Sequence, residues 1–133
     1  MTATDSSVVV AAFASWHRLH ELALDVVDQA PLLPAHAALE AYSVLTRLPR
    51  DRPSPALVVE FLARRFPRPW LALGGEQVSG LLDELQRLNI SGGATYDAVI
   101  GATARAGDAT LVSCDRRAAI TYERLRIAYE LIG

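Results

Sequence analysis

Four carboxylic acids lie at positions where ordinary surface charge explains them poorly: Asp5, Glu40, Asp97 and Asp115. Asp5 and Asp115 each follow an expected strand, and ligand sites of parallel sheets lie beyond the carboxyl ends of the strands. Clustered carboxylates repel one another, and a divalent cation relieves that repulsion. Because hard oxygen ligands select magnesium or manganese over zinc or copper, the four acids predict a Mg²⁺ or Mn²⁺ site.

Glu40 is the strongest single indication of such a site. It falls inside a helix expected over residues 35–48, three residues after Ala37 and four before Val44, which places it on the apolar stripe. A buried carboxylate is costly unless it has a proton, an arginine or a metal as partner. Arg47 lies two turns further along the same face and could be that partner. The alternative is a glutamate at the helix edge that reaches solvent.

The other three acids also have structural alternatives. Asp5 and Asp115 could each serve as the N-cap of the helix that follows, where Asp is favoured. Asp97 falls in the first turn of a helix that Thr95 could cap, and the helix dipole stabilises acids there. Only the joint pattern, with two acids after strands and two on flanking helices, favours a metal site over four separate structural roles.

The elements that must position these acids alternate between strands and helices, which predicts one α/β domain over residues 1–133 with a mostly parallel sheet. Residues 8–14 could be helix or further strand, because periodicity does not separate the two in a short apolar run. The expected strands are 2–5, 32–33, 70–73, 109–113 and 127–132, and the expected helices are 16–29, 35–48, 55–66, 76–89, 96–106 and 116–124.

The basic residues exclude several classes of enzyme. All 13 are arginine, so the chain has no lysine for a Walker phosphate loop, a Schiff base or a receiver-domain pocket. The net charge of −2 is not typical of a nucleic-acid-binding protein, but it becomes positive if four acids are bound to metal. The arginines between residues 47 and 68 could contact phosphates or could simply be solvated.

The remaining reactive side chains point to no other chemistry. Cys114 is the only cysteine, which excludes an internal disulfide and favours a reducing cytoplasm. We interpret His17, His20 and His36 as surface or packing residues. No apolar stretch approaches the ~20 residues of a membrane span, and the first residues do not have the pattern of a signal peptide.

The sequence resembles the PIN-domain family and, within it, the VapC-type toxins of toxin–antitoxin pairs. The likeness covers essentially the whole chain, and the order and spacing of its motifs match. Each motif alone is weak, whereas four in order are fairly specific. They are Asp5-Ser6-Ser7, the segment from Glu40 to Pro49, the segment from Tyr96 to Ala102, and the segment from Leu111 to Arg117.

This resemblance implies a PIN-like α/β/α sandwich with a mostly parallel central sheet of four or five strands. It implies a metal-dependent endoribonuclease that hydrolyses RNA phosphodiester bonds, with Asp5, Glu40, Asp97 and Asp115 as the catalytic, metal-binding acids and Ser7 as a support for Asp5. It further implies a homodimer and a cognate antitoxin protein. Many relatives carry a further Asp shortly after the last acid, which this chain lacks.

Three alternatives remain. A PIN-like module that binds protein or RNA without catalysis would not need all four acids. A haloacid dehalogenase-type phosphohydrolase expects Asp-x-Asp at the first strand, and Asp5-Ser6-Ser7 does not supply it. A structure-specific DNA nuclease shares the acidic chemistry, but this chain is short for the clamp elements that such enzymes add.

Overall fold

The computed structural model describes residues 1–133 and contains seven helices and three strands. The predicted α/β class with a parallel sheet is confirmed, but the predicted alternation holds only in part, because six helices follow one another between β1 and β2. The elements are β1 (Thr2–Thr4), α1 (Ser6–Phe13), α2 (His20–Val27), α3 (Ala35–Thr46), α4 (Pro55–Arg65), α5 (Gly75–Leu88), α6 (Ala94–Ala106), β2 (Thr110–Ser113), α7 (Arg116–Arg124) and β3 (Tyr129–Leu131).

The sheet is parallel throughout, with the strand order β1-β2-β3. Thr4 pairs with Val112, and Ser113 pairs with Leu131. Because β1 and β2 run in the same direction and end side by side, the residues that follow them emerge at one edge of the sheet. This register brings Asp5 and Asp115 to the same edge, as the sequence predicts.

The expected sheet of four or five strands is wrong, since only three strands form. Leu32 and Leu71 lie where the two additional strands were expected, and each makes a single bridge, Ala3 to Leu32 and Pro34 to Leu71. Proline has no N–H to donate to a strand ladder; Pro34 is itself a bridged residue, and Pro69 lies two positions before Leu71. The two segments therefore extend the sheet by one residue pair each.

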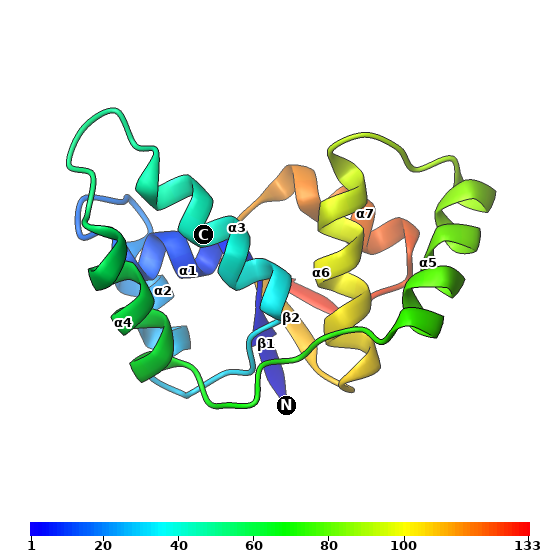
Figure 1. Ribbon diagram of the computed structural model, residues 1–133, viewed down its shortest axis with the longest axis horizontal. Coiled ribbons are helices and arrows are strands. Elements are labelled where there is room, and N and C mark those ends of the chain that lie inside the picture. The colour runs from blue at the N-terminus through cyan, green and yellow to red at the C-terminus, as the bar shows by residue number, and fades with distance from the viewer.

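Helices cover the sheet on both sides (Figure 1). The group α1 to α4 lies on one side and α5 to α7 on the other, and α3 contacts α6 where the two groups meet. The ambiguous segment 8–14 is mostly helix: Val8, Val9, Ala11 and Ala12 of α1 are buried. A helix with apolar residues on all sides is stable only when it is enclosed, and α1 packs against α2, α3 and β2.

Two helix starts differ from the sequence prediction. Helix α2 begins at His20 rather than near residue 16, so the loop between α1 and α2 leaves Trp16 exposed. Helix α6 begins at Ala94 with Gly93 as its N-cap, so the prediction of Thr95 as the cap is wrong. Gly92 has a φ of +64°, a conformation that glycine adopts readily, and this turn starts α6 early.

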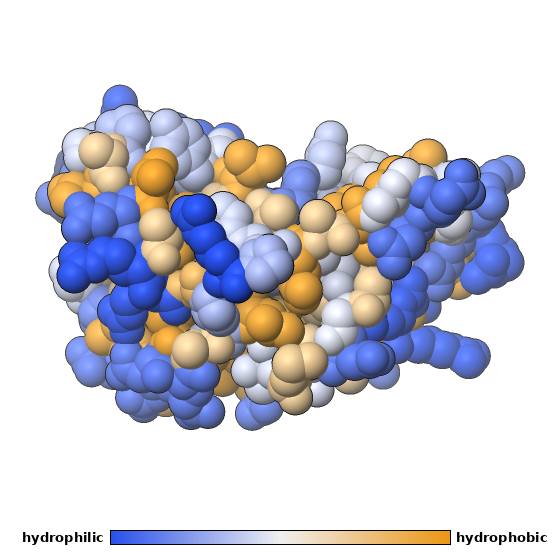
Figure 2. Space-filling model, turned by 60° about the horizontal axis from the view of Figure 1, so that its bottom comes forward, coloured by the Kyte–Doolittle hydropathy of each residue, from blue (hydrophilic) through white to orange (hydrophobic).

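Helix α5 is the most peripheral element. It buries only Leu81 and Leu85, and the end of the molecule that it forms is mainly hydrophilic (Figure 2). No helix in the protein combines the length and the apolar character that crossing a membrane requires.

Candidate active site

Asp5 is buried at the start of α1, with 2% of its surface exposed. Its Oδ1 accepts hydrogen bonds from the hydroxyl of Ser7 at 2.5 Å and from the backbone N–H groups of Ser7 at 3.0 Å and Val8 at 3.3 Å. It is therefore the N-cap of α1, and it also lies at the carboxyl edge of β1. The structural and the functional interpretations of this residue are compatible.

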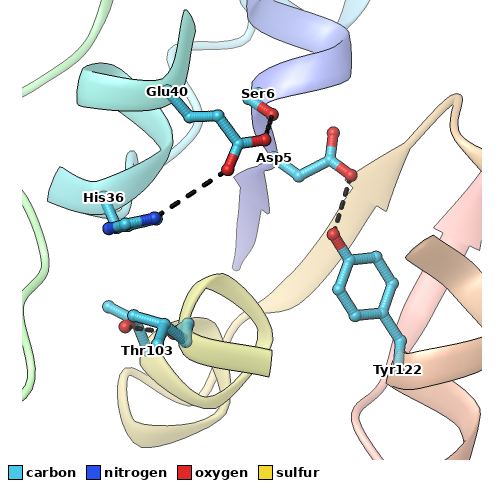
Figure 3. Close-up of polar contacts among 7 residues, drawn as sticks. Asp5, Ser6, His36, Glu40, Thr103 and Tyr122 are labelled. Atoms are coloured by element: carbon cyan, nitrogen blue, oxygen red, sulfur yellow. Dashed lines mark hydrogen bonds and ion pairs between the residues drawn. The ribbon is translucent and has the colours of Figure 1, made fainter. Parts of the chain in front are cut away.

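The second oxygen of Asp5 accepts a hydrogen bond from the phenol of Tyr122 at 2.9 Å (Figure 3). Burial and the neighbouring Asp5 carboxylate raise the pKa of Tyr122, so its hydroxyl stays protonated and donates. Burial raises the pKa of Asp5, and the hydroxyls of Ser113, Ser7 and Tyr122 oppose that rise. Sequence reasoning missed Tyr122; the available signal was a tyrosine on an apolar helix face, because a buried phenol needs a partner.

Glu40 lies on α3 with 32% of its side chain exposed, so it is partly buried, between the predicted position on the apolar stripe and the alternative of a solvent-exposed helix edge. Its Oε1 accepts a hydrogen bond from the Ser6 hydroxyl at 2.6 Å, and its Oε2 lies 3.8 Å from Nε2 of His36 (Figure 3). Arg47 makes no ion pair with it. His36 also stacks on Tyr96 of α6, with ring centroids 5.4 Å apart and an interplanar angle of 4°. His36 thus connects Glu40 to the start of α6.

Asp97 lies half-buried in the first turn of α6, as predicted, and no side chain or backbone group donates a hydrogen bond to it. Burial raises its pKa from 3.8 to about 6, and the carboxylates of Glu40, Asp115 and Asp5 contribute to that rise. Asp97 therefore lies within the electrostatic field of the three other acids.

Asp115 follows β2 and is the N-cap of α7. Its Oδ1 accepts from the N–H groups of Arg117 at 2.9 Å and Ala118 at 3.3 Å. Its own N–H donates to the hydroxyl of Ser113 at 3.0 Å. The N–H of Cys114 donates to Ser7 at 3.0 Å, so the hydroxyl that contacts Asp5 also fixes the segment before Asp115.

The residues fit a hard divalent cation by donor chemistry, because carboxylate oxygens are the ligands that such ions prefer and the carboxylates of Glu40, Asp115 and Asp5 all act on that of Asp97. As placed, no three His, Cys, Asp or Glu side chains are grouped closely enough to hold one ion.

A cavity of about 840 Å³ lies beside these acids. Glu40 and Asp115 line it, together with the N-terminal residues of α1 and α7. The arginines between residues 47 and 68, considered above for binding phosphates, do not line this cavity. Two of them form ion pairs elsewhere, Arg64 with Glu60 and Arg65 with Asp28.

Comparison with known proteins identifies relatives over the full length of the chain. The family model described as "PIN domain" matches residues 3–124. The chain is 48% identical over 133 residues to Ribonuclease VapC40 of Mycobacterium tuberculosis, and the match covers 99% of both proteins.

Two solved structures share the fold at low sequence identity. One is VapC20 of Mycobacterium tuberculosis, described as a sarcin-ricin loop cleaving toxin, with a TM-score of 0.70, 16% identity and coverage of 90% of this chain and 94% of that chain. The other is VapBC2 of Rickettsia felis bound to a DNA fragment from its promoter, with a TM-score of 0.68, 14% identity and coverage of 99% and 98%.

Proposed function

The chain belongs to the PIN-domain family, in its VapC-type branch, and from this membership we propose that it is a metal-dependent endoribonuclease and the toxin of a toxin–antitoxin pair. One observation of the site supports the proposal: burial raises the pKa of Asp97, and the carboxylates of Glu40, Asp115 and Asp5 raise it further. Three acids from distant parts of the sequence thus all act on the ionisation of Asp97. We propose that residues 1–133 form one such domain.

We propose that Asp5, Glu40, Asp97 and Asp115 hold Mg²⁺ or Mn²⁺. When bound, such an ion polarises a phosphate and lowers the pKa of a coordinated water. Ser7 and Tyr122 orient Asp5 by donating to its two oxygens, and Ser6 orients Glu40. These contacts hold the carboxylates in place before the substrate binds, which lowers the free energy needed to assemble the site.

We also propose an antitoxin partner, a homodimer and a cytoplasmic location, where RNA would be available. The partner is supported by the solved VapBC2 assembly, whose toxin has this fold. The alternative, a PIN-like module without catalysis, would bind RNA or protein but leave RNA intact.

The test is RNA cleavage by purified protein in Mn²⁺ or Mg²⁺, together with growth of a bacterial host that expresses the chain. We expect the wild type to cleave RNA and arrest growth, and Asp97→Asn to lose activity at least about 100-fold, because removing even an outer-shell partner of a metal site costs 10- to 100-fold. Asp83→Asn, on the exposed face of α5, is the matched control and should retain activity.

Two results would refute the proposal. The first is a wild-type protein that leaves RNA intact in both metals and does not slow growth, and RNA binding in that case would favour the module without catalysis. The second is equal cleavage by Asp97→Asn and the wild type, which would refute the assignment of the site.

A further inference from the structure

The cavity beside the acids contains an aromatic ring and positive charges that the hydrolytic chemistry does not use. Trp16 and Arg18, from the loop between α1 and α2, line it on one side, and Arg116 and Arg117, from the first turn of α7, line it as well. Since Glu40 and Asp115 line the same cavity, these side chains share one space with two of the acids.

The three arginines are not neutralised by the protein. Arg18, Arg116 and Arg117 are exposed, and none of them takes part in the ion pairs of the structure. Arg116 donates only a long hydrogen bond of 3.4 Å to the carbonyl of Gly133. A guanidinium group without a carboxylate partner is suited to bidentate binding of phosphate. The cavity therefore has cationic groups available for a polyanion.

Trp16 is 56% exposed at this cavity. The other tryptophan, Trp70, is more buried and lies under the guanidinium of Arg68 at 5.1 Å. Beside Trp16 lies the ring of His17, with centroids 6.2 Å apart and an interplanar angle of 34°. Leaving an indole in water forgoes the free energy of its burial, whereas an exposed ring offers a flat surface on which an unpaired base can stack.

We propose that Trp16, Arg18, Arg116 and Arg117 form a nucleotide subsite, in which Trp16 recognises an unpaired base next to the cleaved bond. The inference rests on the ribonuclease function proposed above. An unpaired base stacks on Trp16, and the guanidinium groups bind the flanking phosphates and offset their repulsion by Glu40 and Asp115. In a duplex the bases are stacked inside the helix and cannot reach the indole.

The first experiment measures RNA binding in EDTA, which prevents cleavage, by the fluorescence anisotropy of labelled RNA. The probes are an oligouridylate of roughly 12 nucleotides and an RNA duplex of the same length. We expect Trp16→Ala to weaken binding of the single strand about tenfold, because base stacking on an aromatic ring is worth about 1–3 kcal/mol. Duplex binding should not change. Trp16→Phe should retain most of the affinity, and Leu57→Ala, an exposed apolar change on α4, should match the wild type.

The arginines are tested by the salt dependence of the same binding. Arg18→Ala and Arg116→Ala should weaken binding of both probes and reduce the slope of log Kd against log salt by about 0.7 for each phosphate of the single strand that the variant no longer binds. Arg87→Ala, on the exposed face of α5, is the matched control and should leave the slope unchanged.

Two outcomes would overturn the subsite: equal single-strand affinity of Trp16→Ala and the wild type, or equal weakening of both probes by Trp16→Ala. In the first case, failed inhibition of Trp16→Ala by a partner protein would assign this surface to a protein. A wild type that neither binds nor cleaves RNA would refute the proposed function itself. If the wild type cleaves RNA and Trp16→Ala binds and cleaves RNA as the wild type does, the subsite alone is refuted. In cleavage assays the subsite predicts a higher KM for Trp16→Ala with kcat largely retained.

Discussion

At the level of single residues, the carboxylates of Asp97 and Asp5 differ in their hydrogen-bond partners, although we propose that both belong to one site. Asp5 accepts hydrogen bonds at both carboxylate oxygens. Asp97 accepts none and lies in the field of three other carboxylates, which together with burial raises its pKa to about 6. Asp97 is therefore an acid whose ionisation no hydrogen bond of the protein offsets, and at which stability and the proposed metal binding are opposed.

We predict that Asp97→Asn stabilises the fold at neutral pH in the presence of a chelator. Because the pKa of an aspartate is ordinarily 3.8 and that of Asp97 is about 6 in the fold, the folded state holds this proton more tightly. The resulting contribution to stability is full below the lower value and is lost as the pH rises to about 6. The full shift corresponds to about 3 kcal/mol, and solvent screening at this half-exposed residue reduces it to about 1–2 kcal/mol.

The measurement is urea unfolding of the wild type and Asp97→Asn in EDTA between about pH 4 and pH 7.5, a range that spans the raised pKa. The stability difference should grow with pH up to about 6 and then level off. Asp83→Asn on α5 should show no such trend. A difference that is constant with pH would mean that the carboxylate at position 97 is not perturbed.

At the level of elements, the packing of α6 on α7 fixes the side chain that donates to Asp5. Gly101 lies in α6 and faces the ring of Tyr122 and the side chain of Ile127. A Cβ at position 101 would meet Cδ1 of Tyr122 at 3.1 Å and would lie still closer to Cδ1 of Ile127. The absence of a side chain at Gly101 thus lets Tyr122 pack against α6 while its hydroxyl contacts Asp5.

We predict that Gly101→Ala destabilises the protein by about 1–3 kcal/mol, because a methyl group forced into a packed core displaces its neighbours. The matched control is Gly80→Ala in α5, where a Cβ would meet nothing within 4 Å. That change should stabilise the protein by about 0.5–1 kcal/mol, the helix preference for alanine over glycine. Urea unfolding measures both, and stabilisation of both variants would contradict the close packing of α6.

For the whole molecule, the fold brings together acids that are up to 110 residues apart, since Asp5 and Asp115 come from opposite ends of the chain. A cation held by them would link α1, α3, α6 and α7, the helices on both sides of the sheet. Ligands that bind only the folded state stabilise it by mass action, by about 2.7 kcal/mol at 100 times their Kd. The proposed metal site therefore has a consequence for global stability that does not depend on an RNA substrate.

We predict that Mg²⁺ or Mn²⁺ raises the Tm of the wild type at about pH 7.5 in a concentration-dependent way, and that Asp97→Asn greatly reduces this rise. Sodium chloride at matched ionic strength is the control for general screening. Equal increases of Tm in the wild type and Asp97→Asn would show that the stabilising ions bind elsewhere.

The sequence by itself determined the α/β class, the approximate positions of most helices, the family resemblance and the local role of several acids. The helix caps at Asp5 and Asp115 follow from side-chain hydrogen bonds to N–H groups two or three residues away. Such features depend on a few adjacent residues, so a single chain segment is enough to predict them.

Only the tertiary structure decided which partners the acids have and how many strands form. Tyr122 reaches Asp5 across 117 positions, and Ser6 reaches Glu40 across 34. The cavity that both Trp16 and Arg116 line also brings together residues that are far apart in the sequence. These contacts depend on how helices pack on a shared sheet, because side chains far apart in sequence meet only once the packing of all the elements is fixed.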